Sequence, residues 1–277
     1  MKKFKGLEVW ITGGSSGIGY AAAEAFLKAG ASVMLIARDN GKLAKARETL
    51  LASTGREADS VNTASVDISD YEGVKEVLGA KAVSSGAPDI LVNGAGMAYP
   101  DYFDRIPHDI FVKTINTNLT GTWNVISEVV PLMKKKGGHL VNVSSVAGYV
   151  GTFGYAAYSA SKFGIIGLSE ALKGELKPFN IYVSVLCPPD TDTPQLKEED
   201  RTKPPETRAI SGNVKLMQPE EVAKHLLAGI RKKKFMILPG FMNKVTYIIK
   251  RLAPWIVFMI MDSDIRKVQK AQLKEKI

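Results

Sequence analysis

The sequence has few of the residues that build disulfide or metal sites: one cysteine and three histidines among 277 residues. A lone cysteine, Cys187, cannot form an intramolecular disulfide or provide a thiolate metal site by itself. The histidines lack the short spacings of metal ligands, so we expect no metal. They are His108, His139 and His225. A hydrophobic core must therefore stabilise the fold, and a composition of 45% hydrophobic and 23% charged residues is sufficient for one.

The net charge of +9 is unevenly distributed along the chain. Residues 224–277 contain thirteen Lys and Arg against three acidic residues, which gives this segment a charge of +10. Residues 1–223 contain 24 basic and 25 acidic residues and are close to neutral. A basic excess of this size is compatible with nucleic acid or an anionic membrane as a partner, and here it belongs to the C-terminal end.

Short apolar runs alternate with helix-length segments through most of the chain. Runs of this kind are typical of parallel strands that are buried on both faces, so we expect a Rossmann-type, doubly wound α/β sheet. The expected strands are 7–12, 32–37, 64–66, 90–92, 139–143, 182–186 and 235–238. The expected helices are 41–52, 71–84, 104–136, 156–178 and 219–231.

The domain assignment follows from this pattern and from the segments that interrupt it. Residues 1–240 form one predicted domain, and residues 241–277 form a basic, apolar C-terminal segment. The polar, proline-rich stretch that begins at Pro188 predicts a loop that cannot join the sheet, and we assign residues 188–218 as the substrate loop. The N-terminal apolar run is short and meets a glycine turn, so we expect no secretory signal.

A glycine-rich turn follows the first expected strand and precedes a helix. Glycines there allow backbone amides to approach a pyrophosphate at the N-terminus of the helix, although a turn of this kind is often only a loop. Its position between strand and helix favours nucleotide binding. The turn reads Thr12-Gly13-Gly14-Ser15-Ser16-Gly17-Ile18-Gly19, and we predict cofactor contacts at Gly13, Ser15, Ser16, Gly17 and Gly19.

The end of the second expected strand indicates which dinucleotide is bound. Arg38 and Lys42 place two cations where enzymes that prefer NAD usually have an acid, and cations suit the 2′-phosphate of NADP. The alternative is that Arg38 is a solvated residue at the start of a helix. Asp67 ends the third strand, where it can meet the adenine edge, and Asn93 begins a run of small residues that allows close approach of the cofactor.

Three side chains form the predicted catalytic set. Tyr158 and Lys162 lie one turn apart on an expected helix, so they share one face. A nearby lysine cation stabilises a phenolate and brings the pKa of the tyrosine towards neutrality. Ser145 follows the fifth strand, where it can hydrogen-bond a substrate oxygen.

These motifs together resemble the short-chain dehydrogenase/reductase family over residues 4 to 240. The resemblance implies that Tyr158 donates the proton to the carbonyl oxygen, that Lys162 binds the nicotinamide ribose and that Ser145 orients the carbonyl. It further implies that Asn118 anchors a water of the proton relay and that Thr193 contacts the carboxamide of the cofactor. Pro189 departs from the family, which usually has glycine there.

Within this family, residues 188–208, 154–162 and 177–180 are similar to the 3-ketodihydrosphingosine reductases. The likeness implies NADPH-dependent reduction of 3-ketodihydrosphingosine to dihydrosphingosine, a step of sphingolipid biosynthesis. The alternatives are a reductase of another hydrophobic ketone, such as a steroid or a fatty acyl ketone, and a catalytically idle NADP-binding protein that interacts with membranes. The family resemblance also implies a homodimer or homotetramer.

The C-terminal segment has an apolar face of helical period. Its uninterrupted apolar run, 252–261, is ten residues long and contains Pro254, whereas a transmembrane helix needs about 20 residues. We therefore expect an interfacial segment on a membrane surface that faces the cytoplasm, at the endoplasmic reticulum in a eukaryote. The alternative is packing on its own domain or on a partner. We expect no nucleic acid, because no binding motif accompanies the charge. The face consists of Val245, Ile248, Ile249, Leu252, Trp255, Ile256, Met259 and Ile260.

Overall fold

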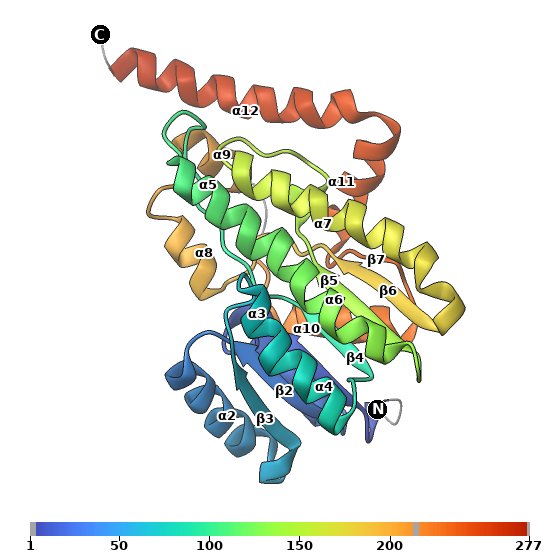
Figure 1. Ribbon diagram of the computed structural model, residues 1–277. Coiled ribbons are helices and arrows are strands. Elements are labelled where there is room, and N and C mark those ends of the chain that lie inside the picture. Colours follow the sequence, from blue (N-terminus) through green and yellow to red (C-terminus); the bar gives the residue numbers. More distant parts are fainter. Residues whose placement is uncertain (1–3, 213–215, 276–277) are drawn as a thin grey trace.

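The computed structural model describes residues 4–212 and 216–275, and at its centre lies a seven-stranded parallel sheet (Figure 1). The strand order is β3-β2-β1-β4-β5-β6-β7, so the order reverses between β1 and β4. Ligands of open α/β sheets bind outside the carboxyl ends of the strands at such a reversal. The strands are β1 Glu8–Thr12, β2 Ser32–Ala37, β3 Val61–Ser65, β4 Ile90–Asn93, β5 Gly138–Val143, β6 Ile181–Leu186 and β7 Met236–Ile237.

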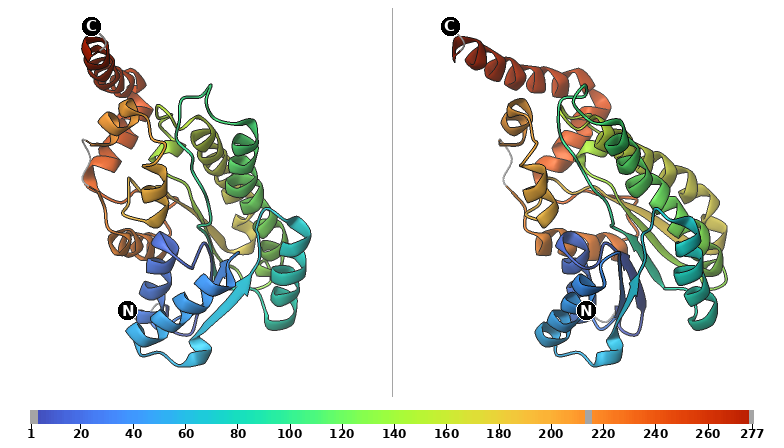
Figure 2. Two further views of the ribbon diagram at one scale, coloured as in Figure 1. Left: turned by 90° about the vertical axis from the view of Figure 1, so that its left-hand side faces the viewer. Right: turned by 60° about the vertical axis from the view of Figure 1, so that its left-hand side comes forward.

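Helices cover both faces of the sheet, which confirms the Rossmann-type, doubly wound fold (Figures 1 and 2). One face carries α1 (Gly17–Lys28), α2 (Asn40–Thr54) and α10 (Pro219–Arg231). The other carries α3 (Tyr71–Val74), η3 (Lys75–Gly79), α4 (Ala80–Ser85), α5 (His108–Ile115), η4 (Asn116–Thr120), α6 (Gly121–Met133) and α7 (Ala156–Glu175).

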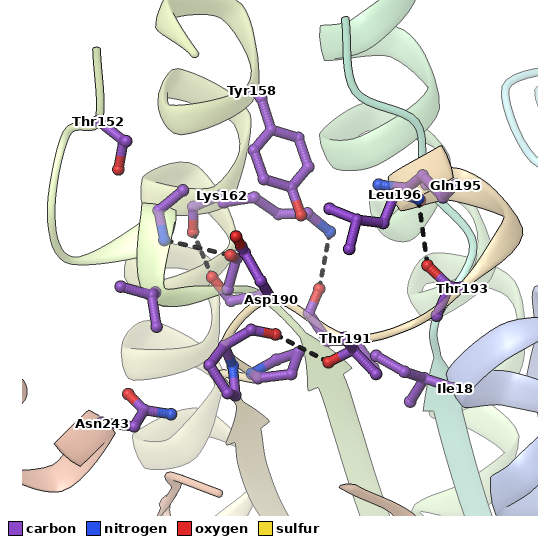
Figure 3. Close-up of a pocket in the computed structure, with 18 of the residues that line it drawn as sticks. Ile18, Thr152, Tyr158, Lys162, Asp190, Thr191, Thr193, Gln195, Leu196 and Asn243 are labelled. Carbon is purple, nitrogen blue, oxygen red and sulfur yellow. Dashed lines mark hydrogen bonds between the residues drawn. The ribbon is translucent and has the colours of Figure 1, made fainter. Parts of the chain in front are cut away.

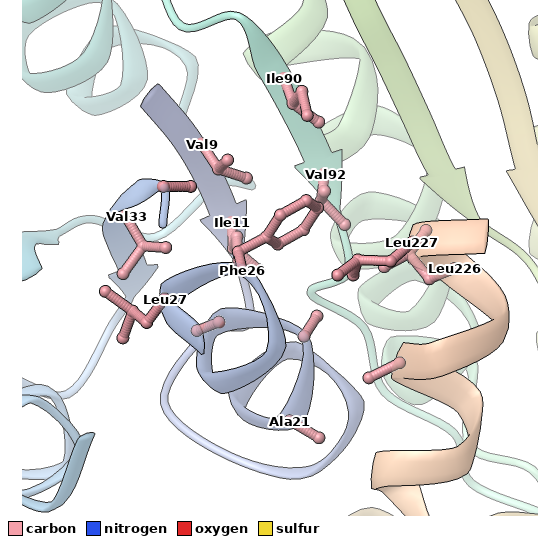
Figure 4. Packing of buried hydrophobic residues seen from close by; sticks show 14 of the residues in the cluster. Val9, Ile11, Ala21, Phe26, Leu27, Val33, Ile90, Val92, Leu226 and Leu227 are labelled. Atoms are coloured by element: carbon pink, nitrogen blue, oxygen red, sulfur yellow. The ribbon is translucent and has the colours of Figure 1, made fainter. Parts of the chain in front are cut away.

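The core of the first face forms because α1 presents small residues where α10 approaches it. Ala21 and Ala22 let the two helices come close, and Phe26 fills the space between α1 and the sheet (Figure 4). Leu226 and Leu227 of α10 complete this layer. Burial of such side chains contributes about 1.5–3 kcal/mol each, which makes this face a main source of stability.

Most expected elements are present, and two expectations are wrong. The third strand is β3, which begins three residues earlier than expected because the polar, exposed residues Asn62 and Thr63 belong to an edge strand. The segment after Pro188 is not one loop: its prolines begin α8 (Pro194–Glu199) and α9 (Pro205–Gly212) instead of excluding helix. Residues 213–215 of the predicted substrate loop, 1–3 of the predicted domain and 276–277 of the tail lie outside the described residues.

The C-terminal segment forms two helices, α11 (Phe241–Leu252) and α12 (Pro254–Glu275). One helix ends and the next begins at Pro254, where we expected this proline to interrupt a helix. The segment packs on the domain, since α12 contacts α9 and Val257 is buried beside Tyr149 and Cys187. In Figures 1 and 2 it crosses the end of the molecule opposite the N-terminus.

The buried His139 makes the stability of the fold depend on pH. Its Nε2 lies 2.7 Å from Ser184 Oγ on the neighbouring strand. Burial, helped by the charge of Lys233, lowers the pKa of His139 to about 4 from the ordinary 6.5. The unfolded chain therefore binds this proton at a higher pH than the folded protein, so stability is lost as the pH falls from 6.5 to 4.

We predict that His139→Asn flattens this loss, by up to about 3 kcal/mol at pH 4, because the titrating group is gone. The free energy of unfolding, measured in urea between pH 4 and 7, tests this. The exposed His108, changed to Asn, serves as the matched control and should keep the wild-type slope. Equal slopes in all three proteins would contradict the prediction.

Candidate active site

A cavity of about 520 Å³ lies at the carboxyl ends of the central strands and extends from the glycine turn to the C-terminal helices (Figure 3). The strand register places the ends of β1, β4, β5 and β6 at one edge of the sheet. Residues far apart in sequence therefore line one space. Of the predicted site residues, the lining includes Gly13, Ser16, Gly17, Gly19, Ser145, Tyr158, Lys162 and Thr193.

The glycine turn forms a cradle that side chains would fill. A Cβ on Gly13, where φ is +71°, would lie 2.9 Å from the backbone of Ala95. A Cβ on Gly17 would lie 3.1 Å from Thr193 Cγ2. Ser16 precedes α1 and, within the described residues, its side chain does not cap that helix. The amides at the start of α1 therefore face the cavity, which suits an anionic pyrophosphate.

The residues predicted to choose between NAD and NADP lie together beyond this turn. Arg38 follows β2 and its Nη1 lies 3.5 Å from Asp67 Oδ2, with 62% of the Arg38 side chain exposed. Lys42 is exposed in the first turn of α2, where its backbone amide is capped by Asp39 Oδ1 at 2.9 Å. Ser69 and Arg38 lower the pKa of Asp67, although partial burial acts in the opposite direction and is the largest single influence. Ser15 is half-buried in the turn and does not line the cavity.

The three predicted catalytic residues come together at the end of β5. Lys162 Nζ donates a hydrogen bond of 2.9 Å to Val143 O and lies 5.5 Å from the centroid of the Tyr158 ring. Ser145 lines the cavity, and its Oγ accepts a hydrogen bond of 3.1 Å from the amide of Ala147. Burial raises the pKa of Tyr158, and hydrogen bonds with Ser145 and Gln195 offset only part of that rise.

The environment of Tyr158 favours its protonated form. Burial raises the pKa of Tyr158, and the nearby carboxylates of Glu199 and Asp190 raise it further. Burial also lowers the pKa of Lys162 to about 8, so this amine can give up a proton near neutral pH. A neutral phenol next to a lysine of this kind is suited to donating a proton, as a reduction requires. The expected shift of the Tyr158 pKa towards neutrality is therefore wrong, because burial raises this pKa above its ordinary value of 10.0.

Asn118 and Asn93 are buried and bind protein groups. Asn118 lies in η4, where its Nδ2 donates to Met97 O and Ser161 Oγ, each at 2.9 Å, and its Oδ1 accepts from the Met97 amide at 2.8 Å. This side chain therefore ties the segment after β4 to α7. Asn93 Nδ2 donates to Asn142 Oδ1 at 2.9 Å, below the cavity rather than in its lining. The predicted roles of Asn118 in the relay and of Asn93 in cofactor binding stay predictions.

Sequence reasoning missed four polar residues of the cavity. Asp190 lies in the loop after β6, Gln195 and Glu199 lie on α8, and Tyr155 precedes α7. Tyr155 Oη donates a hydrogen bond of 2.6 Å to Glu199 Oε2, although 44 residues separate them. The only feature of the sequence that pointed to these residues was the acidic character of the segment after Pro188, and such a segment is also typical of a solvated loop.

The C-terminal segment supplies an apolar wall of the same cavity. Asn243 of α11 is buried, and its Nδ2 donates to Cys187 O at 2.7 Å and Pro239 O at 3.0 Å. Tyr149 donates to Asn243 Oδ1 and packs edge-on against Tyr247, which fixes α11 over the site. The wall consists of Met242, Val245, Ile249, Val257, Ile260 and Met261. The helical period included Val245, Ile249 and Ile260 of this wall, but it did not indicate the cavity that they line.

Comparison with known proteins assigns the class. The family model described as short chain dehydrogenase matches residues 8–204. The chain belongs to the short-chain dehydrogenase/reductase family and is an oxidoreductase.

Two groups of curated relatives are similar to it. The 3-dehydrosphinganine reductase of Danio rerio and the 3-ketodihydrosphingosine reductase of Mus musculus are both 43% identical over 224 residues, which cover 80% of this chain and 68% of each relative. The 3-oxoacyl-(acyl-carrier-protein) reductase of Chlamydia trachomatis is 34% identical over 220 residues, covering 78% of this chain and 87% of that protein.

Solved structures share the fold at lower identity. Levodione reductase matches with a TM-score of 0.76 and 24% identity, covering 84% of this chain and 95% of that one. A short-chain dehydrogenase/reductase from Burkholderia phymatum, in complex with NAD, matches with a TM-score of 0.79 and 24% identity, covering 91% and 95%. At this identity the likeness supports the fold alone.

We predict that Tyr158→Phe lowers turnover of a ketone substrate by at least about 100-fold, because the phenyl ring has no proton to donate. The affinity for NADPH should stay within a few-fold of wild type, since the ring is retained. Steady-state kinetics and a fluorescence titration with NADPH measure the two quantities. Tyr71→Phe, an exposed change on α3, is the control. Retained turnover in Tyr158→Phe would show that Tyr158 is not the proton donor.

Proposed function

We propose that the protein reduces 3-ketodihydrosphingosine to dihydrosphingosine with NADPH. One observation carries the proposal: a single cavity joins the Ser145, Tyr158 and Lys162 side chains to an apolar wall from α11 and α12. A long-chain ketone has both parts, a carbonyl to reduce and an alkyl chain to bury. The names of the relatives that share 43% identity agree with this substrate.

The residues of the chain act on the carbonyl in a simple division of roles. The Ser145 hydroxyl hydrogen-bonds the carbonyl oxygen and orients it towards Tyr158. The Tyr158 hydroxyl gives its proton to that oxygen as negative charge develops there, which neutralises the charge and yields the alcohol. Lys162, held by Val143 O, binds the ribose of the cofactor and replaces the proton on Tyr158. NADPH, when bound, supplies the hydride that converts the carbonyl carbon to an alcohol.

The glycine cradle fits a dinucleotide, and the end of β2 supports NADPH over NADH. Gly13 and Gly17 leave room for a pyrophosphate at the start of α1. Arg38 and Lys42 are both exposed at the adjoining edge, so their charges are accessible to a 2′-phosphate. Asp67 pairs with Arg38, whereas the Lys42 ammonium forms no ion pair within the described residues, although Asp39 caps the start of the same helix.

The proposal is tested by incubating the purified protein with 3-ketodihydrosphingosine and either NADPH or NADH, with mass spectrometry of the product. We expect dihydrosphingosine, formed at least about tenfold faster with NADPH because of the two cations. A ten-carbon ketone is the comparison substrate and should react more slowly, since it leaves the apolar wall unfilled. Tight NADPH binding without product from any long-chain ketone would contradict the proposed reductase activity.

We further propose that the outer surface of the C-terminal helices binds an anionic membrane facing the cytoplasm. The described helices include none with the length and hydropathy that crossing a bilayer would need. Leu252 and Trp255 are 81% and 63% exposed, next to basic residues of α11. Exposed apolar groups beside cations are typical of interfacial binding. Met242 and Ile260 are exposed and also line the cavity, so its mouth opens on this surface.

A homodimer or homotetramer is proposed through α5, α6 and α7. Phe111, Trp123 and Phe163 leave large apolar side chains exposed on these helices, which supports an interface there. Light scattering of the purified protein measures the assembly.

We predict that changing both Leu252 and Trp255 to Ser weakens binding to vesicles with 30% phosphatidylserine by at least about tenfold, because two apolar groups no longer enter the lipid. Sedimentation of the protein with vesicles measures binding. Leu273→Ser, at the far end of α12, is the control for loss of an exposed leucine. Unchanged binding of the double variant would reject this surface, and reduction of a short, soluble ketone checks that the variant is folded.

A further inference from the structure

The cavity has a polar end near the Tyr158 hydroxyl, and two carboxylates there neither donate nor accept the transferred proton. Asp190 lies in the loop after β6 and Glu199 is the last residue of α8; both line the cavity. In Figure 3 the Asp190 side chain points into the part of the cavity that receives Tyr158. Both carboxylates are close enough to raise the pKa of the Tyr158 hydroxyl.

Glu199 is held in position although only 7% of the residue is exposed. Its Oε2 accepts a hydrogen bond of 2.6 Å from Tyr155 Oη, and its Oε1 accepts one of 2.9 Å from Gln195 Nε2. Both donors are neutral groups, so they orient the carboxylate without neutralising it. A buried carboxylate costs free energy unless a cation compensates for the lost water.

The cations near these carboxylates are engaged elsewhere. Lys162 Nζ donates to Val143 O at 2.9 Å. Lys203 is buried outside the lining and pairs with Asp200 Oδ1 at 3.0 Å; burial raises the pKa of Glu199 despite the nearby charge of Lys203, so this lysine compensates Glu199 only in part. Within the described residues, the Asp190 carboxylate forms no hydrogen bond or ion pair. Among the described residues that line the cavity, two carboxylates thus accompany a single cation, Lys162.

We propose that Asp190, with Glu199 behind it, binds an ammonium group on the carbon next to the reacting carbonyl. The inference rests on the proposed function, since 3-ketodihydrosphingosine is an amino ketone of this kind. Its nitrogen lies about 2.5 Å from the carbonyl carbon, as in any N–C–C unit. When the carbonyl oxygen meets Ser145 and Tyr158, the ammonium therefore lies in the polar end of the cavity, where Asp190 can accept a charge-assisted hydrogen bond.

This subsite separates two classes of ketone that the apolar wall alone would accept equally. An amino ketone brings its own cation and compensates the carboxylates. A 3-oxoacyl compound or a steroid brings an uncharged carbon to the same place and leaves the carboxylates without a counter-charge. A site built to bind a polar group of its substrate discriminates strongly against an analogue without that group, because the polar side chain of the site is then left without a partner.

The test compares 3-ketodihydrosphingosine with 1-hydroxyoctadecan-3-one, which has the same chain and hydroxyl but no amine. The ratio of kcat/KM for the two ketones is measured for wild type, Asp190→Asn and Asp192→Asn. Asp192 is the matched control, because it lies in the same loop, outside the cavity lining, and pairs with Lys197 at 3.4 Å. We expect wild type and Asp192→Asn to prefer the amine at least tenfold, and Asp190→Asn to lose most of that preference.

A binding measurement separates this inference from the proposed function. Calorimetry with NADP-loaded protein compares dihydrosphingosine with octadecane-1,3-diol. If wild type reduces neither ketone but binds the amine better in a manner that depends on Asp190, the subsite stands and the proposed reduction fails. An equal ratio for both ketones in wild type, or a preference that survives in Asp190→Asn, overturns the subsite. If neither reaction nor binding distinguishes the amine, the subsite is likewise rejected.

Discussion

Two hydrogen bonds hold α7 against the end of β5, and the arrangement of the site depends on them. Ser144 Oγ donates to Lys162 O at 2.9 Å, and Lys162 Nζ donates to Val143 O at 2.9 Å. The strand end and the helix are thereby locked in register, so that Ser145 from one and Tyr158 from the other meet at the cavity. A hydrogen bond that involves a buried charged group is among the stronger ones in proteins, which keeps this register rigid.

The C-terminal helices add an apolar wall to the polar part of the cavity. Asn243 and Tyr149 fasten α11 over the cavity, and α12 contacts α9 beyond it. Apolar side chains on the inner side of the tail extend the site, while Leu252 and Trp255 face outwards. The segment therefore packs on its own domain, which is one of the possibilities that its sequence left open, and it also leaves apolar side chains exposed. The cavity is polar at Asp190 and apolar at this wall.

Most of the sheet was predictable because each buried strand is a continuous apolar run between turn residues. β3 was the exception, since an edge strand tolerates polar residues such as Asn62 and carries a weak pattern. α8 was also missed, because a proline that starts a helix and a proline that ends one look alike without the cap; here Thr193 Oγ1 caps α8 by accepting from the Leu196 amide at 3.2 Å.

The sequence by itself determined the doubly wound sheet, the glycine turn and the Ser145, Tyr158 and Lys162 set, because each depends on local order or on one turn of a helix. Only the tertiary structure decided that Tyr155 binds Glu199, that Asp190 and Tyr158 line the same cavity and that the basic tail packs over it. These contacts join segments that are distant in sequence. Their partners are chosen by packing, and no local pattern records which buried side chains will meet.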